Sequence, residues 1–558
     1  MVETAALTQT AVGTPTGESH RSTGGQALVE SLKQHGVDTI FGLPGIQLDG
    51  FFHALYDARD AIRVVHTRHE QATAYMADGY ARVTGREGVC CIVPGPGLLN
   101  AAAGLATAYS CNSPVLCLTG QIRSDLIDRD TGVLHEIPNQ IGMIRSVTKH
   151  AARATTPGDI PTTVREAFCQ LRTGRSRPVE VEIPPDTLFA EADVVLPPAA
   201  GPRERFAGDP DRIDRAAHLL GEATNPLIFA GGGIQRADAG EELLALAEAL
   251  QAPVIVSRNG KGAISDRHYL AHGTFAEIEY LPGADVVLIV GSRFTDILGS
   301  TRKIGSHQTL IQLDIDPAEI GRNHPVAVGI EADAKAGLAA LADRVGRYNR
   351  RRPSREHELT AFKQAAEERI NSVHPQADFG LAIRVEVPDE GIIVNESTQV
   401  GYWSFLGMPV YLPNTFLTSG YQGTLGYGFT TAMGAKVGKP DVPVVSINGD
   451  GGFGFTLNEL STLVQHDIRL IAVVFNDNAY GNVRRIQDQE YDGRIIASDL
   501  LNPDYGLLAK AFGVADRRAE TPAELRLQLR EAIKADEPTL IEVPVGVMPN
   551  QRKVLGLV

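Results

Sequence analysis

Cysteine is scarce in this chain, with five among 558 residues: Cys90, Cys91, Cys111, Cys117 and Cys169. They are too few and too clustered for the disulfide framework of a secreted domain, and they lack the paired spacing of metal ligands. Most of them lie in apolar runs. We therefore read them as buried reduced thiols.

Positive charge is also in short supply, because 52 Lys and Arg face 67 Asp and Glu, a formal charge of −15. This balance argues against nucleic acid or an anionic membrane as the main partner, although a local basic pocket for a phosphate stays open. No apolar run reaches the ~18 residues of a membrane span. Residues Met1–Gly24 lack the apolar core of a signal peptide, so we expect a flexible tail and a cytoplasmic location.

What the chain does contain is an alternation of short apolar runs and helical stretches. In the first third, the expected strands are 39–41, 62–65, 88–93, 115–119 and 179–183, and the expected helices are 25–35, 70–84 and 100–109. Later strands are expected at 227–230, 254–257, 286–290, 309–313, 392–394, 444–447, 470–475 and 539–543. Strands that alternate with helices predict parallel sheets covered on both faces. The predicted fold class is α/β, with three doubly wound parallel-sheet domains.

Two polar stretches divide the chain. Residues 196–210 are rich in proline, and residues 349–356 are dense in arginine and contain Pro353. Both are typical of linkers. We predict a tail over 1–24 and domains over 25–195, 208–348 and 358–558.

The strongest local pattern is a glycine-rich turn in the last domain. The apolar run 444–447 ends in Asn448-Gly449-Asp450-Gly451-Gly452-Phe453, and the next strand ends in Asn476-Asp477-Asn478. Glycines after a strand let backbone N–H groups approach a phosphate, and an aspartate there can hold a divalent cation. Because both strand ends lie on one edge of a parallel sheet, the two turns can share one cation. Either turn alone is also compatible with an ordinary loop.

Together these turns resemble the cofactor motif of the thiamine-diphosphate enzymes. In that family the cation is Mg²⁺, and the resemblance places its ligands at Asp450, Asp477 and the carbonyl of Ala479. Asn is the commoner family residue at position 477. Asp keeps an oxygen ligand and adds a charge, so the choice between Mg²⁺ and Ca²⁺ stays open.

A second stretch, near the start of the chain, extends the resemblance. The segment HEQATAYMADGYARVTG, residues 69–85, is similar to the family's pyrimidine-domain helix, and residues 41–45 and 94–109 also match. The resemblance implies that the Glu70 carboxylate shares a proton with the aminopyrimidine ring of the cofactor, an exchange that a raised pKa would favour. Taken alone, Glu70 would be a helix N-terminal carboxylate stabilised by the helix dipole.

The resemblance covers about residues 25–544 and is greatest to the acetolactate synthase branch, through NAYGNVRR (478–485), ASDLLNPDYGLLAKAFGV (497–514) and LIEVPV (540–545). It implies pyrimidine-binding, middle and diphosphate-binding domains in that order. It also implies a homodimer or homotetramer with active sites at the subunit interface. Leu425 would hold the cofactor bent, and the Gly423 carbonyl would accept from its amino group. The cofactor contacts that it implies are Pro44, Gly45, Glu70, Gly423, Leu425, Gly449, Asp450, Gly451, Gly452, Asp477, Ala479, Tyr480 and Gly481.

Three positions depart from the synthase branch and bear on the reaction. The family's Phe-Gln-Glu triplet is Leu134-His135-Glu136 here, so an imidazole stands in place of an amide. Ile486 replaces a tryptophan that faces substrate, and Glu490, four residues on, stands where the branch often has Phe. A base at His135 and an acid at Glu490 would suit a cleavage that takes a proton from a hydroxyl. We predict Glu70, His135 and Glu490 as catalytic residues, and a solvated surface charge is the alternative for Glu490.

The resemblance implies an enzyme that makes or breaks a carbon–carbon bond of a 2-oxo or 2-hydroxy acid derivative, through a thiazolium-stabilised carbanion. The first hypothesis is a decarboxylase and carboligase of the acetolactate-synthase type. The second is a 2-hydroxyacyl-CoA lyase that releases an aldehyde or ketone and formyl-CoA from a CoA thioester. The other readings are an authentic acetolactate synthase, a simple 2-oxo acid decarboxylase and an inert cofactor-binding protein, and the retained Glu70 argues against the last.

The middle domain leaves its ligand open. Flavin-binding synthases of the branch carry a Gly-Met-His-Gly stretch, and this chain has LAHGTF at 270–275 instead. The stretches Gly291–Phe294 and Leu313–Pro317 remain similar to the family. In relatives such a domain binds FAD, an ADP or CoA nucleotide, or nothing.

Overall fold

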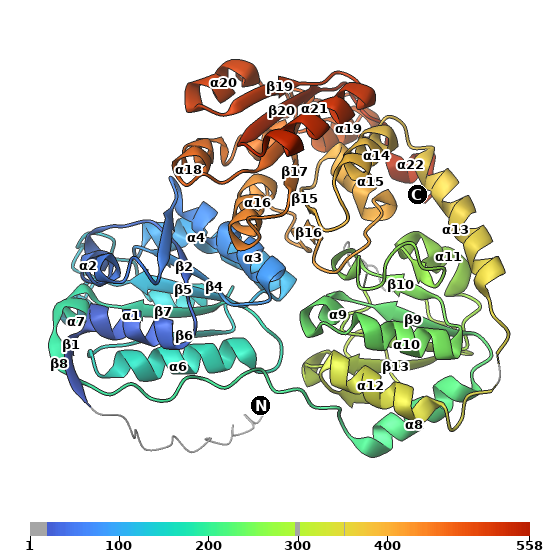
Figure 1. Cartoon of the computed structure of the whole chain (residues 1–558), viewed down its shortest axis with the longest axis horizontal. Coiled ribbons are helices and arrows are strands. Elements are labelled where there is room, and N and C mark those ends of the chain that lie inside the picture. Colours follow the sequence, from blue (N-terminus) through green and yellow to red (C-terminus); the bar gives the residue numbers. More distant parts are fainter. Residues whose placement is uncertain (1–18, 296–301, 351, 558) are drawn as a thin grey trace.

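The computed structural model describes residues 19–295, 302–350 and 352–557. This part of the chain forms three α/β domains, each built on a six-stranded parallel sheet flanked by helices (Figure 1). The predicted fold class is therefore confirmed. No helix in the described ranges is long and apolar enough to cross a membrane.

The N-terminal sheet has the strand order β3-β2-β4-β5-β7-β6. Its strands are β2 (Thr39–Gly42), β3 (Arg63–His66), β4 (Gly88–Ile92), β5 (Val115–Gly120), β6 (His150–Arg153) and β7 (Val179–Ile183). The helices are α1 (Gly24–Gln34), α2 (Asp49–Asp57), α3 (Glu70–Thr84), α4 (Pro96–Cys111), α5 (Gln140–Ile144), α6 (Asp159–Arg172) and α7 (Pro185–Phe189), with short 3₁₀ turns η1 (Ile46–Leu48) and η2 (Ser124–Leu126). The strand order reverses between β2 and β4, so a crevice opens at their carboxyl ends.

The middle sheet has a different order, β11-β10-β9-β12-β13-β14. Its strands are β9 (Pro226–Ala230), β10 (Val254–Val256), β11 (Ala271–His272), β12 (Val286–Val290), β13 (Thr309–Asp314) and β14 (Val328–Glu331). Around them lie α8 (Pro210–Glu222), α9 (Gly232–Ala237), α10 (Gly240–Leu250), α11 (Glu277–Tyr280), α12 (Ala334–Val345), η3 (Arg258–Gly260), η4 (Thr274–Ala276) and η5 (Pro317–Glu319). This is the strand order of dinucleotide-binding sheets, with its reversal between β9 and β12.

The C-terminal sheet repeats the N-terminal topology with the order β16-β15-β17-β18-β20-β19. Its strands are β15 (Ile392–Asn395), β16 (Phe416–Thr418), β17 (Val444–Gly449), β18 (Ile471–Asn476), β19 (Ala515–Arg518) and β20 (Thr539–Pro544). The helices are α13 (Glu356–Asn371), α14 (Gln376–Glu386), α15 (Gln399–Gly407), α16 (Tyr427–Gly438), α17 (Asp450–Phe453), α18 (Leu460–Gln465), α19 (Gly481–Glu490), α20 (Tyr505–Phe512), α21 (Pro522–Ala535) and α22 (Gln551–Val554), with η6 (Leu457–Glu459) before α18. The reversal between β15 and β17 places a second crevice beside Asp450.

The N-terminal and C-terminal domains share one hydrophobic core, in which α3 packs on α16. Small residues permit this close approach, because a Cβ at Gly79 would collide with the backbone of Thr431, and one at Gly434 with the backbone of Met76. The ring of Tyr75 lies edge-on to that of Tyr427, with centroids 6.0 Å apart. The helix that begins at Glu70 is therefore rigidly held.

The structure corrects the sequence analysis at two kinds of place. The tail ends earlier than Gly24, because His20–Thr23 form β1, which pairs antiparallel with β8 (Glu191–Val194), and Thr23 caps α1. The predicted tail residues 1–18 lie outside the described residues. The strands that were missed, β6, β11, β14, β16 and β19, are all edge strands. They are short or half-exposed, so they lack the continuous apolar run that marked the buried strands.

The cysteines are free thiols, as expected. Cys90, Cys91 and Cys117 are buried, whereas Cys111 and Cys169 are partly exposed. Burial raises the pKa of the Cys91 thiol well above its usual value. The three buried thiols therefore serve as small apolar core residues, whereas the expectation of burial was wrong for Cys111 and Cys169.

Candidate functional site

Asp450 and Asp477 follow the paired strands β17 and β18, so they lie at one sheet edge, as the sequence predicted. Asp450 is buried, and its Oδ2 accepts hydrogen bonds from the Ala479 N–H at 3.2 Å and from Asn502 Nδ2 at 2.6 Å. Asp477 is half-buried beside it. The structure thus brings the three predicted metal ligands, Asp450, Asp477 and Ala479, into one place.

Burial disfavours the ionisation of both carboxylates, and the charge of Asp450 further disfavours that of Asp477. Burial, and then the charge of Asp450, raise the pKa of Asp477 to about 7. Burial also raises the pKa of Asp450, against the hydrogen bonds from Asn502 and the backbone. A divalent cation between the carboxylates would relieve this repulsion.

Glycine is required around this pair by close contacts. A Cβ at Gly451 would collide with the Tyr480 ring. A Cβ at Gly452 would collide with the Glu396 carboxylate, and one at Gly481 with the Asp477 carboxylate. Because these glycines have no side chains, a phosphate could approach the backbone of the turn after β17 closely. The glycine surface and the paired carboxylates fit the diphosphate end of thiamine diphosphate with its cation. No group of three or more His, Cys, Asp and Glu that could hold a metal occurs in the described ranges, so a cation here would also need neutral oxygens.

Two residues that the sequence analysis did not single out support this half of the site. Asn502 Nδ2 also lies 2.9 Å from Asn476 Oδ1, so one amide bridges the turns after β17 and β18. Glu396, directly after β15, is buried and accepts the Gly426 N–H at 2.8 Å. Burial raises the pKa of Glu396 to about 7. Asn502 lies in a stretch that matched the family, and Glu396 ends an apolar strand as Asp450 does, so both had a sequence signal.

Glu70 begins α3, directly beyond β3 at the corresponding edge of the N-terminal sheet. Its Oε2 accepts a hydrogen bond from Asn100 Nδ2 of α4 at 3.0 Å. A Cβ at Gly97 would lie 3.5 Å from Glu70 Oε1, so the first turn of α4 passes close to the carboxylate. Glu70 is half-buried, and Pro44 and Gly45 follow β2 on the same edge.

His135 lies on the same edge, in the loop after β5. Its backbone is left-handed, with φ of 69°, and its Nδ1 lies 3.0 Å from Gln47 Oε1. Its carbonyl sits so close to Gly95 that a Cβ there would collide with it. Gly95 is the N-cap residue of α4, whose first turn approaches Glu70. The structure therefore places both His135 and Glu70 near the start of α4.

Gly423 and Leu425 lie in the turn between β16 and α16. Gly423 is exposed with φ of 60°, a left-handed conformation that favours glycine. Thr424, between them, hydrogen-bonds Thr107 of α4 through their hydroxyls at 2.9 Å. Leu425 is half-buried, which leaves part of its side chain available for a ligand.

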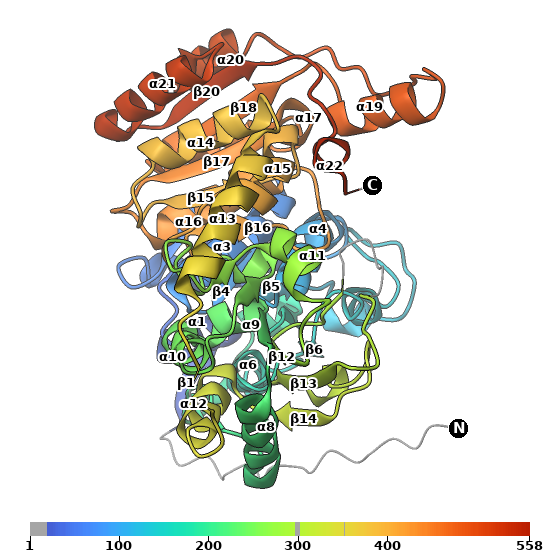
Figure 2. The same cartoon turned by 90° about the vertical axis from the view of Figure 1, so that its right-hand side faces the viewer.

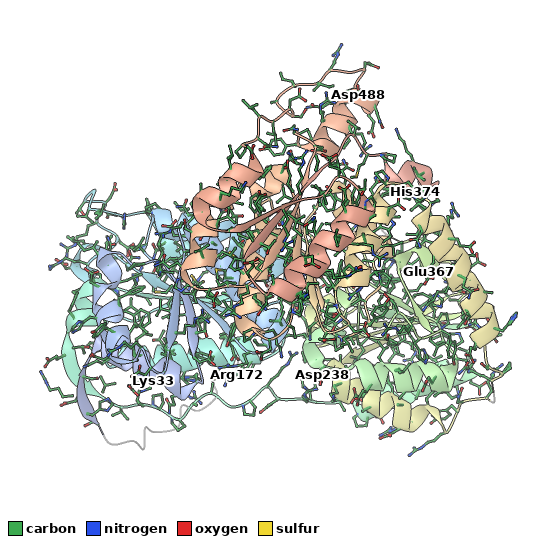
Figure 3. The ribbon with its side chains drawn as sticks, turned by 45° about the horizontal axis from the view of Figure 1, so that its top comes forward. Lys33, Arg172, Asp238, Glu367, His374 and Asp488 are labelled. Carbon is green, nitrogen blue, oxygen red and sulfur yellow. The ribbon has the colours of Figure 1, made fainter. Side chains whose placement is uncertain are left out.

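Glu490 is the last residue of α19, and its side chain is exposed. Across the described part of the chain it makes no hydrogen bond or ion pair. Figure 2 shows α19 projecting from the C-terminal domain, and Figure 3 places Asp488 of the same helix at the outer rim. Within one chain the structure does not bring Glu490 to Glu70 or His135, and its role stays a prediction.

Among the described residues of one chain, Glu70 makes no hydrogen bond to the turns that hold Asp450 and Asp477. Both halves are flanked by exposed apolar side chains. Ile46, Leu99 and Leu134 lie in the loops and helix around Glu70, and Val483, Tyr491, Ile496 and Leu501 lie on and after α19. Leu134 is 63 % exposed and Ile496 is 75 % exposed.

A separate cavity of about 1060 Å³ lies where the three domains meet. It is lined by residues that follow β9, β12 and β13, namely Gly231, Gly232, Gly233, Ser292, Arg293, Asp314 and Asp316, and by Arg175 and Arg177 of the N-terminal domain. The stretches 291–294 and 313–317 that matched the family therefore form its wall.

Comparison with known proteins bears on all three domains. Family models of the thiamine pyrophosphate enzymes match here in order: the N-terminal TPP binding domain at residues 22–143, the central domain at 213–341 and the C-terminal TPP binding domain at 396–543. A probable acetolactate synthase large subunit of Methanocaldococcus jannaschii is 36% identical over 94% of this chain and 92% of its own length. The acetolactate synthase large subunit of Corynebacterium glutamicum is 34% identical over 94% of this chain and 87% of its own. A probable 2-ketoarginine decarboxylase of Pseudomonas aeruginosa is 34% identical over 93% and 94%.

Proposed function

Because this chain belongs to the acetolactate synthase-like branch of the thiamine pyrophosphate enzymes, we propose that it decarboxylates a 2-oxo acid and joins the remaining acyl unit to an acceptor. It is a thiamine-diphosphate-dependent enzyme that makes or breaks carbon–carbon bonds in a small-molecule substrate. The proposal is carried by two features found in one chain. Asp450 and Asp477 form a carboxylate pair that could bind a divalent cation, and Glu70 begins α3.

When bound, thiamine diphosphate supplies an acidic thiazolium carbon whose conjugate base adds to a substrate carbonyl. Asp450, Asp477 and the Ala479 carbonyl would hold Mg²⁺ against the diphosphate, and the glycine turn would present its N–H groups to the phosphate oxygens. Glu70 would exchange a proton with the aminopyrimidine through its carboxylate, which Asn100 orients. His135 would hold or release a proton beside the same turn, with Gln47 fixing its ring.

We propose that a second copy of the chain completes each site. The Glu70 half and the Asp450 half each end in exposed apolar side chains, and a two-fold dimer would bring one half from each chain together. The prediction of a homodimer or a homotetramer rests on this pairing. The cytoplasmic location expected from the sequence remains a prediction.

The acyl side chain of the substrate is the least determined part of the reaction. The names of the relatives support a 2-oxo acid rather than a hydroxyacyl-CoA thioester, which stays the alternative. One observation favours a cationic 2-oxo acid as a second candidate: Asp488 and Glu490 place two carboxylates at the free end of α19. One relative carries the name of a decarboxylase for such a substrate.

We also propose that the cavity between the domains takes the phosphate groups of a nucleotide. Glycine turns at strand ends and several arginines suit phosphate oxygens. FAD and an ADP or CoA nucleotide share this chemistry. Absorbance near 450 nm, followed by mass spectrometry of the heat-released ligand, would distinguish them.

A substrate panel tests the proposed function. Purified protein with thiamine diphosphate and Mg²⁺ would be given pyruvate, 2-oxobutanoate, 2-oxo-5-guanidinopentanoate and 2-hydroxyacyl-CoA compounds, with products weighed by mass spectrometry. We expect carbon dioxide from at least one 2-oxo acid. Cleavage of the thioesters alone would overturn the proposal in favour of the lyase.

A further inference from the structure

Glu459 has a buried carboxylate that accepts hydrogen bonds from the segment directly before Glu70. It ends η6, nine residues after Asp450, and has no exposed surface. Its Oε1 accepts the backbone N–H groups of Arg68 at 3.0 Å and His69 at 2.9 Å, and its Oε2 also lies 3.0 Å from the Arg68 nitrogen. These are the two residues directly before Glu70. A side chain of the C-terminal domain thus caps the entry to α3.

Other groups strengthen this contact between domains. Gln71 Nε2 donates to the Phe455 carbonyl at 3.0 Å, and Arg68 Nη2 donates to Gln465 Oε1 at 3.0 Å. The residues on either side of Glu70 are therefore bonded to 455–465, the segment that follows the Asp450 turn. Glu70 itself makes none of these bonds, and its carboxylate accepts a hydrogen bond from Asn100.

The donors around Glu459 favour its ionised form, against the burial that raises its pKa. Besides the two N–H groups, Thr462 Oγ1 lies 2.6 Å from Oε2 and Asn458 Nδ2 lies 3.2 Å from Oε1. Burial raises the pKa of Glu459, but of these four donors only the Thr462 hydroxyl could instead accept a proton from a carboxyl. A buried charge that is bonded in this way fixes its donors more strongly than a neutral acceptor would.

We propose that Glu459 is a positioning residue for Glu70: by fixing the Arg68 and His69 N–H groups, it sets the place and direction in which α3 presents the Glu70 carboxylate to the cofactor. The inference rests on the role proposed for Glu70. It follows from the geometry because Arg68 and His69, the N-cap residue, lead directly into α3, and the bonds of their N–H groups to Glu459 fix where the helix begins. A shift of about 1 Å at a proton-transferring group costs on the order of 10²-fold in rate.

The first test uses the cofactor-free protein. Amide hydrogen exchange of the peptide that covers residues 66–71 would be followed by mass spectrometry in the parent, Glu459→Ala and Thr462→Val. Thr462→Val is the matched control, because it removes a bond to the same carboxylate and leaves the backbone bonds intact. We expect exchange roughly tenfold or more faster in Glu459→Ala and close to parental in the control. Parental exchange in Glu459→Ala would overturn the proposal.

The second test separates positioning from a purely structural role. Deuterium exchange at the thiazolium carbon, at saturating thiamine diphosphate and Mg²⁺, should slow by ~10–10² in Glu459→Ala and by less than ~3-fold in Glu459→Gln, whose single oxygen can accept both N–H groups. In a Glu70→Gln background, Glu459→Ala should add less than ~3-fold, because its effect passes through Glu70. Multiplied losses would show that Glu459 acts independently and would contradict the proposal.

Two further outcomes are distinguishable. If Glu459→Ala does not fold, Glu459→Asp replaces it. The shorter side chain keeps the charge but moves it away from the Arg68 and His69 N–H groups. Amide exchange should then rise, and thiazolium exchange should slow, by less than expected for Glu459→Ala. Parental values in both tests for that variant would overturn the inference. If Glu70→Gln itself leaves thiazolium exchange unchanged, the role of Glu70 fails, while the amide exchange still decides whether Glu459 holds the turn.

Discussion

The two halves of the candidate site are built in opposite ways. Around Asp450, a buried carboxylate pair, a bridging Asn502 and glycines without room for a Cβ form a dense set of contacts within one domain. Around Glu70, the carboxylate is half-buried, has Asn100 as its hydrogen-bond partner and lies among exposed apolar side chains. The difference teaches that the contacts around Asp450 lie within one domain, whereas the Glu70 carboxylate has few partners, and we propose that a second chain covers it.

The largest effect should come from a change in the Glu70 half of the site. Glu70→Gln keeps the size and a hydrogen bond to Asn100 but removes the exchangeable proton. Turnover and thiazolium deuterium exchange should fall by ~10²–10⁴, with the affinity for thiamine diphosphate within a few-fold of the parent. Exchange kinetics followed by NMR would measure this. An unchanged exchange rate would assign the proton transfer to another group.

A change in the Asp450 half of the site should weaken cofactor binding. Asp450→Ala removes a cation ligand and the acceptor of Asn502 and Ala479, so the affinity for Mg²⁺ and diphosphate should drop by ~10² or more. Calorimetric titration with thiamine diphosphate, with and without Mg²⁺, would follow it. Asn100→Ala, in the other half, is the matched control and should leave this affinity near the parental value. Parental affinity in Asp450→Ala would remove the cation site.

A smaller effect follows from the raised pKa of Asp477. A carboxyl with a folded pKa of about 7 and an unfolded pKa of about 3.9 favours folding when protonated, so its contribution is present below pH 4 and is lost as pH rises to 7. The melting temperature of cation-free parent should therefore fall from pH 5 to pH 8 by more than that of Asp477→Asn. Saturating Mg²⁺ should remove the difference. Equal pH slopes without cation would contradict the coupling.

The smallest expected effect is at the exposed end of α19. Glu490→Gln should leave thiazolium exchange and cofactor affinity unchanged. It should raise the KM for a cationic 2-oxo acid by up to about tenfold, the size of a lost charged contact, while pyruvate kinetics stay parental. Steady-state kinetics on the two substrates would show it. Parental kinetics on both would make Glu490 a surface charge.

The sequence predicted the buried parts of the fold better than its edges. Strands such as β4 and β12 are continuous apolar runs because helices cover both faces, whereas β19 (Ala515–Arg518) alternates half-buried and exposed residues and is mostly polar. Asp450 and Asp477 were predictable because spacing along adjacent parallel strands fixes where they meet. Glu459 was not, because its bonds depend on how turns from different domains approach each other.

The most direct test of the account is a hybrid of two inactive variants. Glu70→Gln and Asp450→Ala would be mixed under subunit-exchange conditions, with hybrid formation followed by native mass spectrometry. If each site takes Glu70 from one chain and Asp450 from the other, every hybrid dimer carries one intact site, and an equal mixture should regain about a quarter of the parental activity. Hybrids that form in full but remain inactive would contradict the account and place both halves of the site within a single chain.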